Sequence, residues 1–145
     1  MNESGFKFQD HTADIQVESW APTLEEAFSQ TALSLMTIIT PNLSLVESKI
    51  EKELRIKAED IKALLFDFLS EFLYLFDVED LIFSKIHVQS ITKIKGYHEL
   101  SAIVKGEKFD KKKHEIGTEV KAVTYSFMTI EEKENRIIVN IVFDI

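Results

Sequence analysis

The sequence contains no cysteine, which removes several kinds of chemistry at once. Disulfide frameworks, thiolate metal sites and cysteine nucleophiles all need that side chain. Only four glycines and two prolines occur in 145 residues. The sequence has no Gly-rich phosphate-binding loop, no Gly-x-Ser-x-Gly nucleophile elbow and no His-Glu-x-x-His zinc motif. We therefore do not expect a self-sufficient enzyme that cleaves nucleotides.

Long apolar runs are also missing from the sequence. No stretch approaches the roughly 20 apolar residues that a membrane-spanning helix needs. The first residues, Met1 to Gly5, lack the basic and apolar regions of a secretory signal peptide. We expect a soluble protein of the cytoplasm, or of the nucleus as well if the source is a eukaryote, with no membrane partner.

Basic side chains are in the minority, with 17 Lys and Arg against 25 Asp and Glu and a formal net charge of -8. A negative protein is repelled by phosphate backbones, which are bound largely through Lys and Arg. The one basic run, Lys111 to Lys113, stands beside Asp110 and Glu115. A solvated turn is favoured there over a nucleic-acid patch, so we predict no strong direct binding of nucleic acid.

Two segments carry helical signals. Thr23 and Glu26 have the spacing of a capping box, the apolar residues that follow recur with helical spacing, and Pro41 ends this element. A second helix is predicted from about 60 to 76, where the apolar residues form one broad stripe.

Most of the remaining sequence has the short apolar alternation of β-strands. The predicted strands cover 14–18, 53–58, 83–91, 97–105, 118–130 and 136–143. The last is almost continuously apolar, which indicates a strand inside a sheet. With too few helical crossovers for a parallel sheet, the pattern predicts an α+β fold. We expect one domain over residues 1–145, with a largely antiparallel sheet packed by two main helices.

Carboxylates stand at both ends of this predicted sheet. Asp14 begins the first predicted strand, and Asp144 follows the apolar run of the last. If those strands are close, both side chains and the α-carboxylate of Ile145 converge as hard oxygen donors. Such donors suit Ca²⁺, Mg²⁺ or Mn²⁺ rather than Zn²⁺. Spacing alone favours the alternative that Asp14 caps a turn and the chain end frays.

Two further residues have both a chemical and a structural interpretation. His11 could be a metal ligand or an acid–base group, although an isolated histidine beside Thr and Asp is more often a hydrogen-bonded structural residue. Lys121 shares one face of the predicted 118–130 strand with Glu119. Taken alone, this pattern favours a surface ion pair of little energetic value. The alternative is a cation held beside an acidic site to engage phosphate or a partner carboxylate.

Several blocks of the sequence, taken in order, resemble the archease family. They are Asp10–Ile15, Thr23–Phe28, Leu64–Phe76, Gly106-Glu107 with His114, Gly117–Tyr125 and the terminal Phe143–Ile145. These blocks span almost the full length. The combination of His-Thr-Ala-Asp near the N-terminus with Asp-Ile at the C-terminus is far more specific to the family than either motif alone.

The resemblance implies a set of functional residues. In the family the front aspartate, the terminal aspartate and the last carboxylate bind a divalent cation, which corresponds to Asp14, Asp144 and Ile145. Ca²⁺ is the first expectation, with Mg²⁺ or Mn²⁺ as alternatives. The motif lysine, here Lys121, is implicated in activation, and His11 and Glu119 are candidate supporting residues. No catalytic residue is implied.

The resemblance also implies a role as an accessory protein rather than an enzyme. Archeases promote guanylylation of an RtcB-type RNA ligase, a GTP-dependent reaction on the ligase, and so allow multiple turnover in tRNA splicing. Two other hypotheses stay open. A standalone metal-dependent phosphohydrolase would turn over without the ligase. A chaperone-like binding module would protect aggregating clients without needing Asp14 or a cation.

Overall fold

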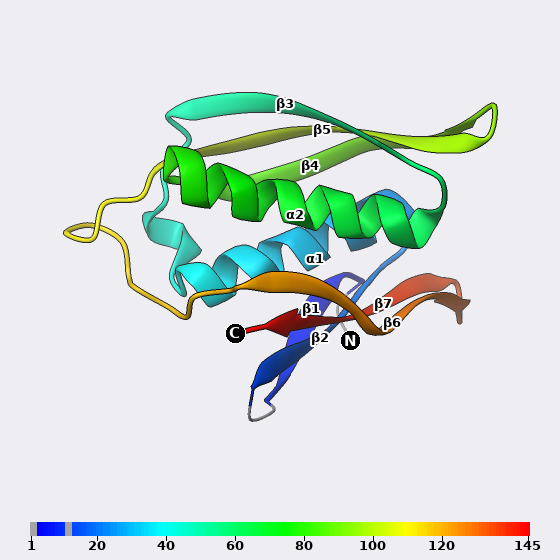
Figure 1. Ribbon diagram of the computed structural model, residues 1–145, viewed down its shortest axis with the longest axis horizontal. Coiled ribbons are helices and arrows are strands. Elements are labelled where there is room, and N and C mark those ends of the chain that lie inside the picture. The colour runs from blue at the N-terminus through cyan, green and yellow to red at the C-terminus, as the bar shows by residue number, and fades with distance from the viewer. Residues whose placement is uncertain (1–2, 11–12) are drawn as a thin grey trace.

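Two antiparallel sheets enclose a pair of helices in the computed structural model, which describes residues 3–10 and 13–145 (Figure 1). The strands are β1 (Gly5–Asp10), β2 (Asp14–Ala21), β3 (Ile50–Ala58), β4 (Leu81–Ile94), β5 (Tyr97–Lys108), β6 (Ala122–Lys133) and β7 (Arg136–Asp144). The helices are α1 (Leu24–Ile39) and α2 (Ile61–Glu79), with a short 3₁₀ turn η1 (Leu43–Leu45). One sheet has the order β1-β2-β7-β6, and the other has the order β3-β5-β4. The predicted α+β class, antiparallel pairing and two main helices are confirmed.

Both helices begin at the side-chain caps that local sequence favours. Thr23 Oγ1 accepts a hydrogen bond from the Glu26 N–H at 3.1 Å, and Asp60 accepts one from the Ala63 N–H at 2.8 Å. Each bond satisfies a backbone donor that the first helical turn leaves without a partner. At its other end α2 runs three residues past the predicted end and stops where Asp80 adopts a left-handed conformation with φ 58°.

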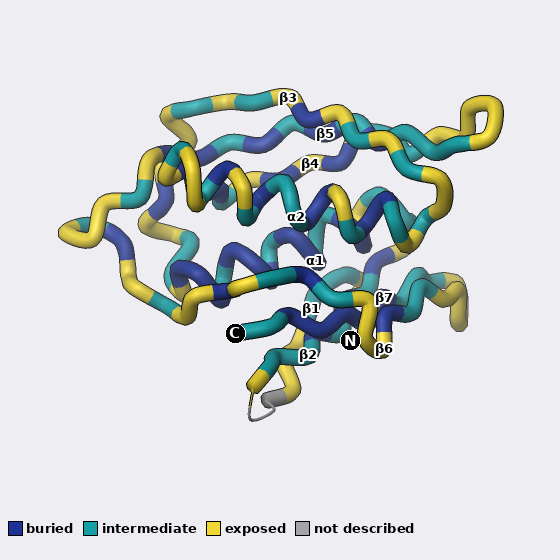
Figure 2. Tube along the Cα trace, in the orientation of Figure 1, coloured by how far each residue is buried: buried dark blue, intermediate teal, exposed yellow. Residues whose placement is uncertain are grey.

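The core lies between the sheets, on the helix faces that Figure 2 shows in dark blue. Its largest fully buried side chains include Phe28 of α1, Phe68 and Phe72 of α2, and Phe83 of β4. The Phe68 and Phe72 rings meet edge to face at 5.1 Å, and the Phe72 and Phe83 rings do so at 5.8 Å. Such pairs add to the burial of apolar area, so the aromatic residues join α2 to the three-stranded sheet.

Three details of the strand assignment differ from the prediction. β1 was not predicted, because Phe6 and Phe8 are its only large apolar residues. The strands form two sheets, which no local pattern can specify. The strand predicted over 118–130 begins only at Ala122. The preceding backbone is bonded elsewhere, because the N–H groups of Gly117 and Thr118 donate to carbonyl oxygens at the end of α1.

The interior position predicted for the last strand is confirmed, because β7 lies between β2 and β6. No helix in the described part of the chain is both long enough and apolar enough to cross a membrane.

Candidate functional site

Three chain segments meet at one end of the four-stranded sheet. Asp14 is the first residue of β2, Asp144 is the last residue of β7, and Ala122 is the first residue of β6. The strand register places Asp144 directly opposite Asp14 on one side and Ala122 on the other. The two aspartates predicted from opposite ends of the sequence are therefore neighbours across a β-ladder.

The backbone also fixes the residues that flank this ladder. The Lys121 N–H donates to the carbonyl oxygen of Asp144 at 2.7 Å. The Ile145 N–H donates to the carbonyl oxygen of Ala13 at 3.3 Å. Lys121 and Ile145 are thus held, at the level of the main chain, beside the two aspartates.

Asp14 and Asp144 lie on the face of the sheet that points away from the helices. Along β2 the buried side chains are Val17, Ser19 and Ala21, and Ser19 hydrogen-bonds to Thr31 of α1. Side chains alternate between faces, so Asp14 belongs to the opposite face. Directly opposed residues on an antiparallel ladder have Cβ atoms about 5 Å apart, and like charges in that position destabilise the pair. Two ionised aspartates here call for a counter-charge.

A cavity of about 150 Å³ adjoins Asp14. Its walls are formed by Asp14, Gln16, Val142 and Phe127. Phe127 comes from a bulge in β6, where it adopts a left-handed conformation with φ 55° and is 80% exposed. The cavity is larger than the volume of one water molecule, which is about 30 Å³.

The Oδ1 atom of Asp14 is buried and has no hydrogen-bond partner within the described residues. Leaving a carboxylate oxygen in that state costs free energy, because its hydration is lost without compensation. A divalent cation bound to this atom would remove the cost. The oxygen chemistry of Asp14, Asp144 and the Ile145 carboxyl fits Ca²⁺, Mg²⁺ or Mn²⁺.

The side-chain donors alone do not make a closed metal cage. Within the described part of the chain, no group of three or more His, Cys, Asp or Glu side chains lies together in a way that could hold a metal ion. A cation at Asp14 and Asp144 would therefore also need main-chain or water oxygens, which Ca²⁺ and Mg²⁺ commonly use. His11, one of the two predicted supporting residues, lies outside the described residues.

The prediction that Lys121 and Glu119 share one face of a β-strand is wrong. Both residues precede β6, both are exposed, and no ion pair joins them in the described structure. Glu119 borders a different hollow of about 270 Å³, which also contacts Phe76 and Phe109. The structure therefore brings Lys121, but not Glu119, to the aspartate pair, through the backbone hydrogen bond from Lys121 to Asp144.

A buried ionic network holds the segment that leads to Lys121. The Asp110 N–H donates to Nδ1 of His114 at 2.9 Å, so Nε2 carries the ring proton and donates to Glu107 at 3.1 Å. Glu107 also accepts hydrogen bonds from Lys113 Nζ at 2.8 Å and from the Glu47 N–H at 2.6 Å. These contacts join the end of β5 to the loop that precedes β6.

The charge state of Glu107 follows from these contacts. Burial on its own raises the pKa of this carboxyl. The hydrogen bonds from the Glu47 N–H, Lys113 and His114 outweigh burial and lower the pKa from 4.5 to about 2. Sequence reasoning assigned Glu107 and His114 no role. The one available signal was that Gly106-Glu107 and His114 are among the blocks that resemble the archease family.

The sequence profile described as the Archease protein family (MTH1598/TM1083) matches residues 6–145. The chain belongs to the archease family. Protein archease of Pyrococcus furiosus is 44% identical over 122 residues, which are 84% of this chain and 84% of that protein. An archease-like protein of Dictyostelium discoideum is 36% identical over 142 residues, covering 97% of this chain and 93% of its own length.

Solved archease-like structures have the same architecture. The solution structure of protein 1598 from Methanobacterium thermoautotrophicum superposes with a TM-score of 0.85 at 35% identity, covering 97% of this chain and 99% of that one. The crystal structure of a Thermotoga maritima protein, described as an archease and possible chaperone, superposes with a TM-score of 0.60. At 22% identity over 96% of each chain, that second match supports the fold alone.

Proposed function

We propose that this archease is a metal-binding accessory protein of the cytoplasm that activates an RtcB-type RNA ligase in tRNA splicing. It would promote GTP-dependent guanylylation of the ligase and so allow multiple turnover. The observation that carries the proposal is the cross-strand pairing of Asp14 with Asp144, together with the unpartnered buried oxygen of Asp14. Family membership supports the accessory role.

In this proposal the two aspartates and the Ile145 carboxyl hold the divalent cation. When bound, the cation supplies a positive charge that can attract phosphate oxygens. Asp14 and Asp144 set its place because their strands are paired in a fixed register. The hydrogen bond between the Lys121 backbone and Asp144 keeps that lysine close by. Its exposed ammonium group can engage a phosphate or a carboxylate of the ligase.

The test is an assay of covalent ligase–GMP formation with a cognate ligase, GTP and Mn²⁺. Catalytic amounts of this protein should raise ligase–GMP and the yield of ligated RNA. Lys121→Ala should remove most of the increase. Lys133→Ala, which changes an exposed lysine at the far end of β6, is the matched control and should retain it.

Unchanged guanylylation over a range of protein concentrations would refute the accessory role. Equal activation by the Lys121→Ala and wild-type proteins would remove that lysine from the mechanism. Hydrolysis of GTP by the isolated protein, lost in Asp14→Ala, would instead favour the phosphohydrolase hypothesis.

A chaperone-like binding module is the second candidate, because the Thermotoga maritima relative is described as a possible chaperone. This chain exposes several large apolar side chains, among them Val78 (61%), Ile116 (72%) and Phe127 (80%). Such side chains can contact unfolded clients. Suppression of client aggregation that persists in Asp14→Ala and without ligase would support this candidate.

A further inference from the structure

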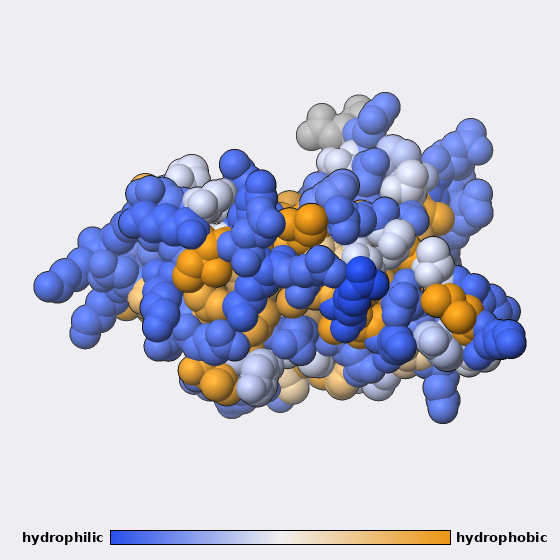
Figure 3. All heavy atoms as spheres, turned by 90° about the horizontal axis from the view of Figure 1, so that it is seen from above, coloured by the Kyte–Doolittle hydropathy of each residue, from blue (hydrophilic) through white to orange (hydrophobic). Residues whose placement is uncertain are grey.

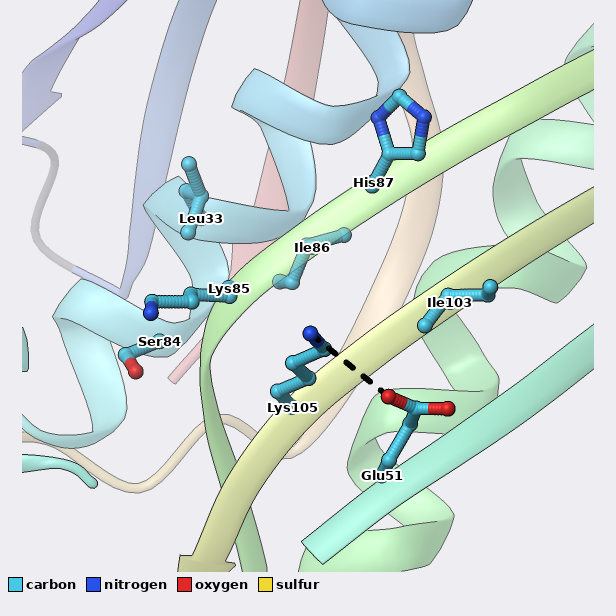
Figure 4. A pocket seen from close by; sticks show the side chains of 8 residues that line it. All are labelled: Leu33, Glu51, Ser84, Lys85, Ile86, His87, Ile103 and Lys105. Atoms are coloured by element: carbon cyan, nitrogen blue, oxygen red, sulfur yellow. Dashed lines mark ion pairs between the residues drawn. The ribbon is translucent and has the colours of Figure 1, made fainter. Parts of the chain in front are cut away.

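A groove of about 560 Å³ lies on the three-stranded sheet, which is a different sheet from the one that carries Asp14. Figure 4 shows side chains from four elements around it, with Leu33 from α1 on one side and Glu51 from β3 on the other. Between them are Ser84 to His87 of β4, with Ile103 and Lys105 of β5. Its volume is in the range of sites that bind small molecules, about 300–1,000 Å³.

Most of the groove is on the outer face of this sheet, and Leu33 of α1 and Ile86, which pairs with the buried Val104, line it at the β4 edge. Along β5, Leu100, Ala102 and Val104 are fully buried and point to the helices, whereas Ile103 and Lys105 alternate with them and face outwards. Seen from the side of this sheet, the surface is mostly polar, and apolar atoms show between the polar side chains (Figure 3). The outer face therefore offers both charge and apolar contact.

One cation of this face has no counter-ion. The others form ion pairs, which are Arg55–Glu53 (2.8 Å), Lys57–Glu99 (3.7 Å) and Lys105–Glu51 (3.7 Å). Lys85 forms none with any described residue, and the β4–β5 register places it directly opposite Lys105. Like charges in that position repel each other. An anion bound between Lys85 and Lys105 would relieve the repulsion.

The walls limit what that anion can be. Leu33, Ile86 and Ile103 give the groove apolar surface beside the two ammonium groups. In Figure 4 the Lys105 ammonium reaches toward Glu51, and Lys85 lies on the side of α1. The chain as a whole carries a net charge of -8, which disfavours long polyanions such as RNA. A small anion with an apolar ring matches both the charge and the walls.

We propose that this groove binds a phosphate monoester that carries an apolar or aromatic ring, such as a mononucleotide. The phosphate lies between Lys85 and Lys105, and the ring lies on Ile103, the apolar side chain of the outer face. Glu51 pairs with Lys105 and so weakens the attraction for the anion. This site is independent of the proposed activation of the ligase, because no residue of the aspartate pair contributes to it.

The test is an amide NMR titration of the full chain at low ionic strength with adenosine monophosphate. Adenosine and inorganic phosphate are the controls, because each contains only one half of the nucleotide. The nucleotide should give saturable shifts centred on β4 and β5, with weaker binding of either half. Lys85→Ala should weaken nucleotide binding about fivefold, and Glu51→Gln should tighten it about threefold. Lys57→Ala changes a paired lysine on the same sheet outside the groove, and it should leave the affinity unchanged.

Several results would overturn the proposal. One is the absence of saturable shifts with adenosine monophosphate, and another is a set of shifts centred on β2 and β7. An equal loss of affinity in Lys57→Ala and Lys85→Ala would reduce the effect to general surface charge. Single-stranded RNA that binds these residues more tightly than the mononucleotide would make the groove a nucleic-acid surface instead.

Discussion

Protonation of Glu107 should lower the stability of the fold in acid. The pKa of this carboxyl is about 2 in the folded protein and 4.5 in its unperturbed state. At about 1.4 kcal/mol for each pKa unit, the difference corresponds to about 3 kcal/mol of folding free energy. Because the folded value is the lower one, this stabilisation is complete above the unfolded pKa. It is lost as the pH falls from about 4.5 to about 2.

The assay is urea unfolding of the wild type and Glu107→Gln over a series of pH values. The variant lacks the charge that accepts hydrogen bonds from Lys113 and His114. It should be less stable by up to about 3 kcal/mol near neutral pH, and the difference should shrink toward zero near pH 2. Glu115→Gln removes an exposed carboxylate of the same loop and should change stability by less than about 0.5 kcal/mol.

A difference between wild type and Glu107→Gln that stays constant from neutral pH to pH 2 would refute this reasoning. The ionised carboxylate would then contribute nothing specific to the network around His114.

Three further predictions concern the aspartate pair and the segment that leads to it. Saturating Ca²⁺, at about 100 times its Kd, should raise the free energy of unfolding by about 2.7 kcal/mol; Asp14→Asn should abolish this increase in chemical denaturation. Residues appended after Ile145 should weaken cation binding in calorimetric titration, and unaltered affinity would exclude the Ile145 carboxyl as a ligand. Gly117→Ala should destabilise the protein by about 2 kcal/mol or more, because the added Cβ would lie 2.1 Å from the Ile38 carbonyl oxygen; unfolding at an unchanged urea concentration would contradict this.

Local signals in the sequence predicted the elements well where neighbouring residues decide the structure. The Thr23 cap and the apolar stripe of α2 are contained within a few turns of chain, so their helices were found with nearly correct starts. β1 was missed because an edge strand with two large apolar residues has little periodic signal. The start of β6 was placed too early, because the bonding of Gly117 to Ile39 is a contact with a distant helix.

The candidate sites, like the helices and strands, could be predicted only as far as neighbouring residues determine them. Residue types at the two chain ends raised the question of a hard-oxygen site, and the family resemblance selected Asp14, Asp144 and Ile145. The direct opposition of the two aspartates depends on β2–β7 pairing, which no short segment encodes. The network of Glu107 and His114 and the groove at Lys85 also depend on contacts between separate elements. Charge counts alone could not reveal either feature.

The central claim is that the paired aspartates are required for activation of an RNA ligase. The direct measurement is multiple-turnover RNA ligation by a cognate RtcB-type ligase, with the wild type, Asp14→Asn or Asp144→Asn added in catalytic amount. These replacements preserve side-chain shape and remove charge. The account predicts many turnovers with the wild type and no increase over ligase alone with either variant. Turnover by Asp14→Asn equal to that of the wild type, or no increase with the wild type itself, would contradict it.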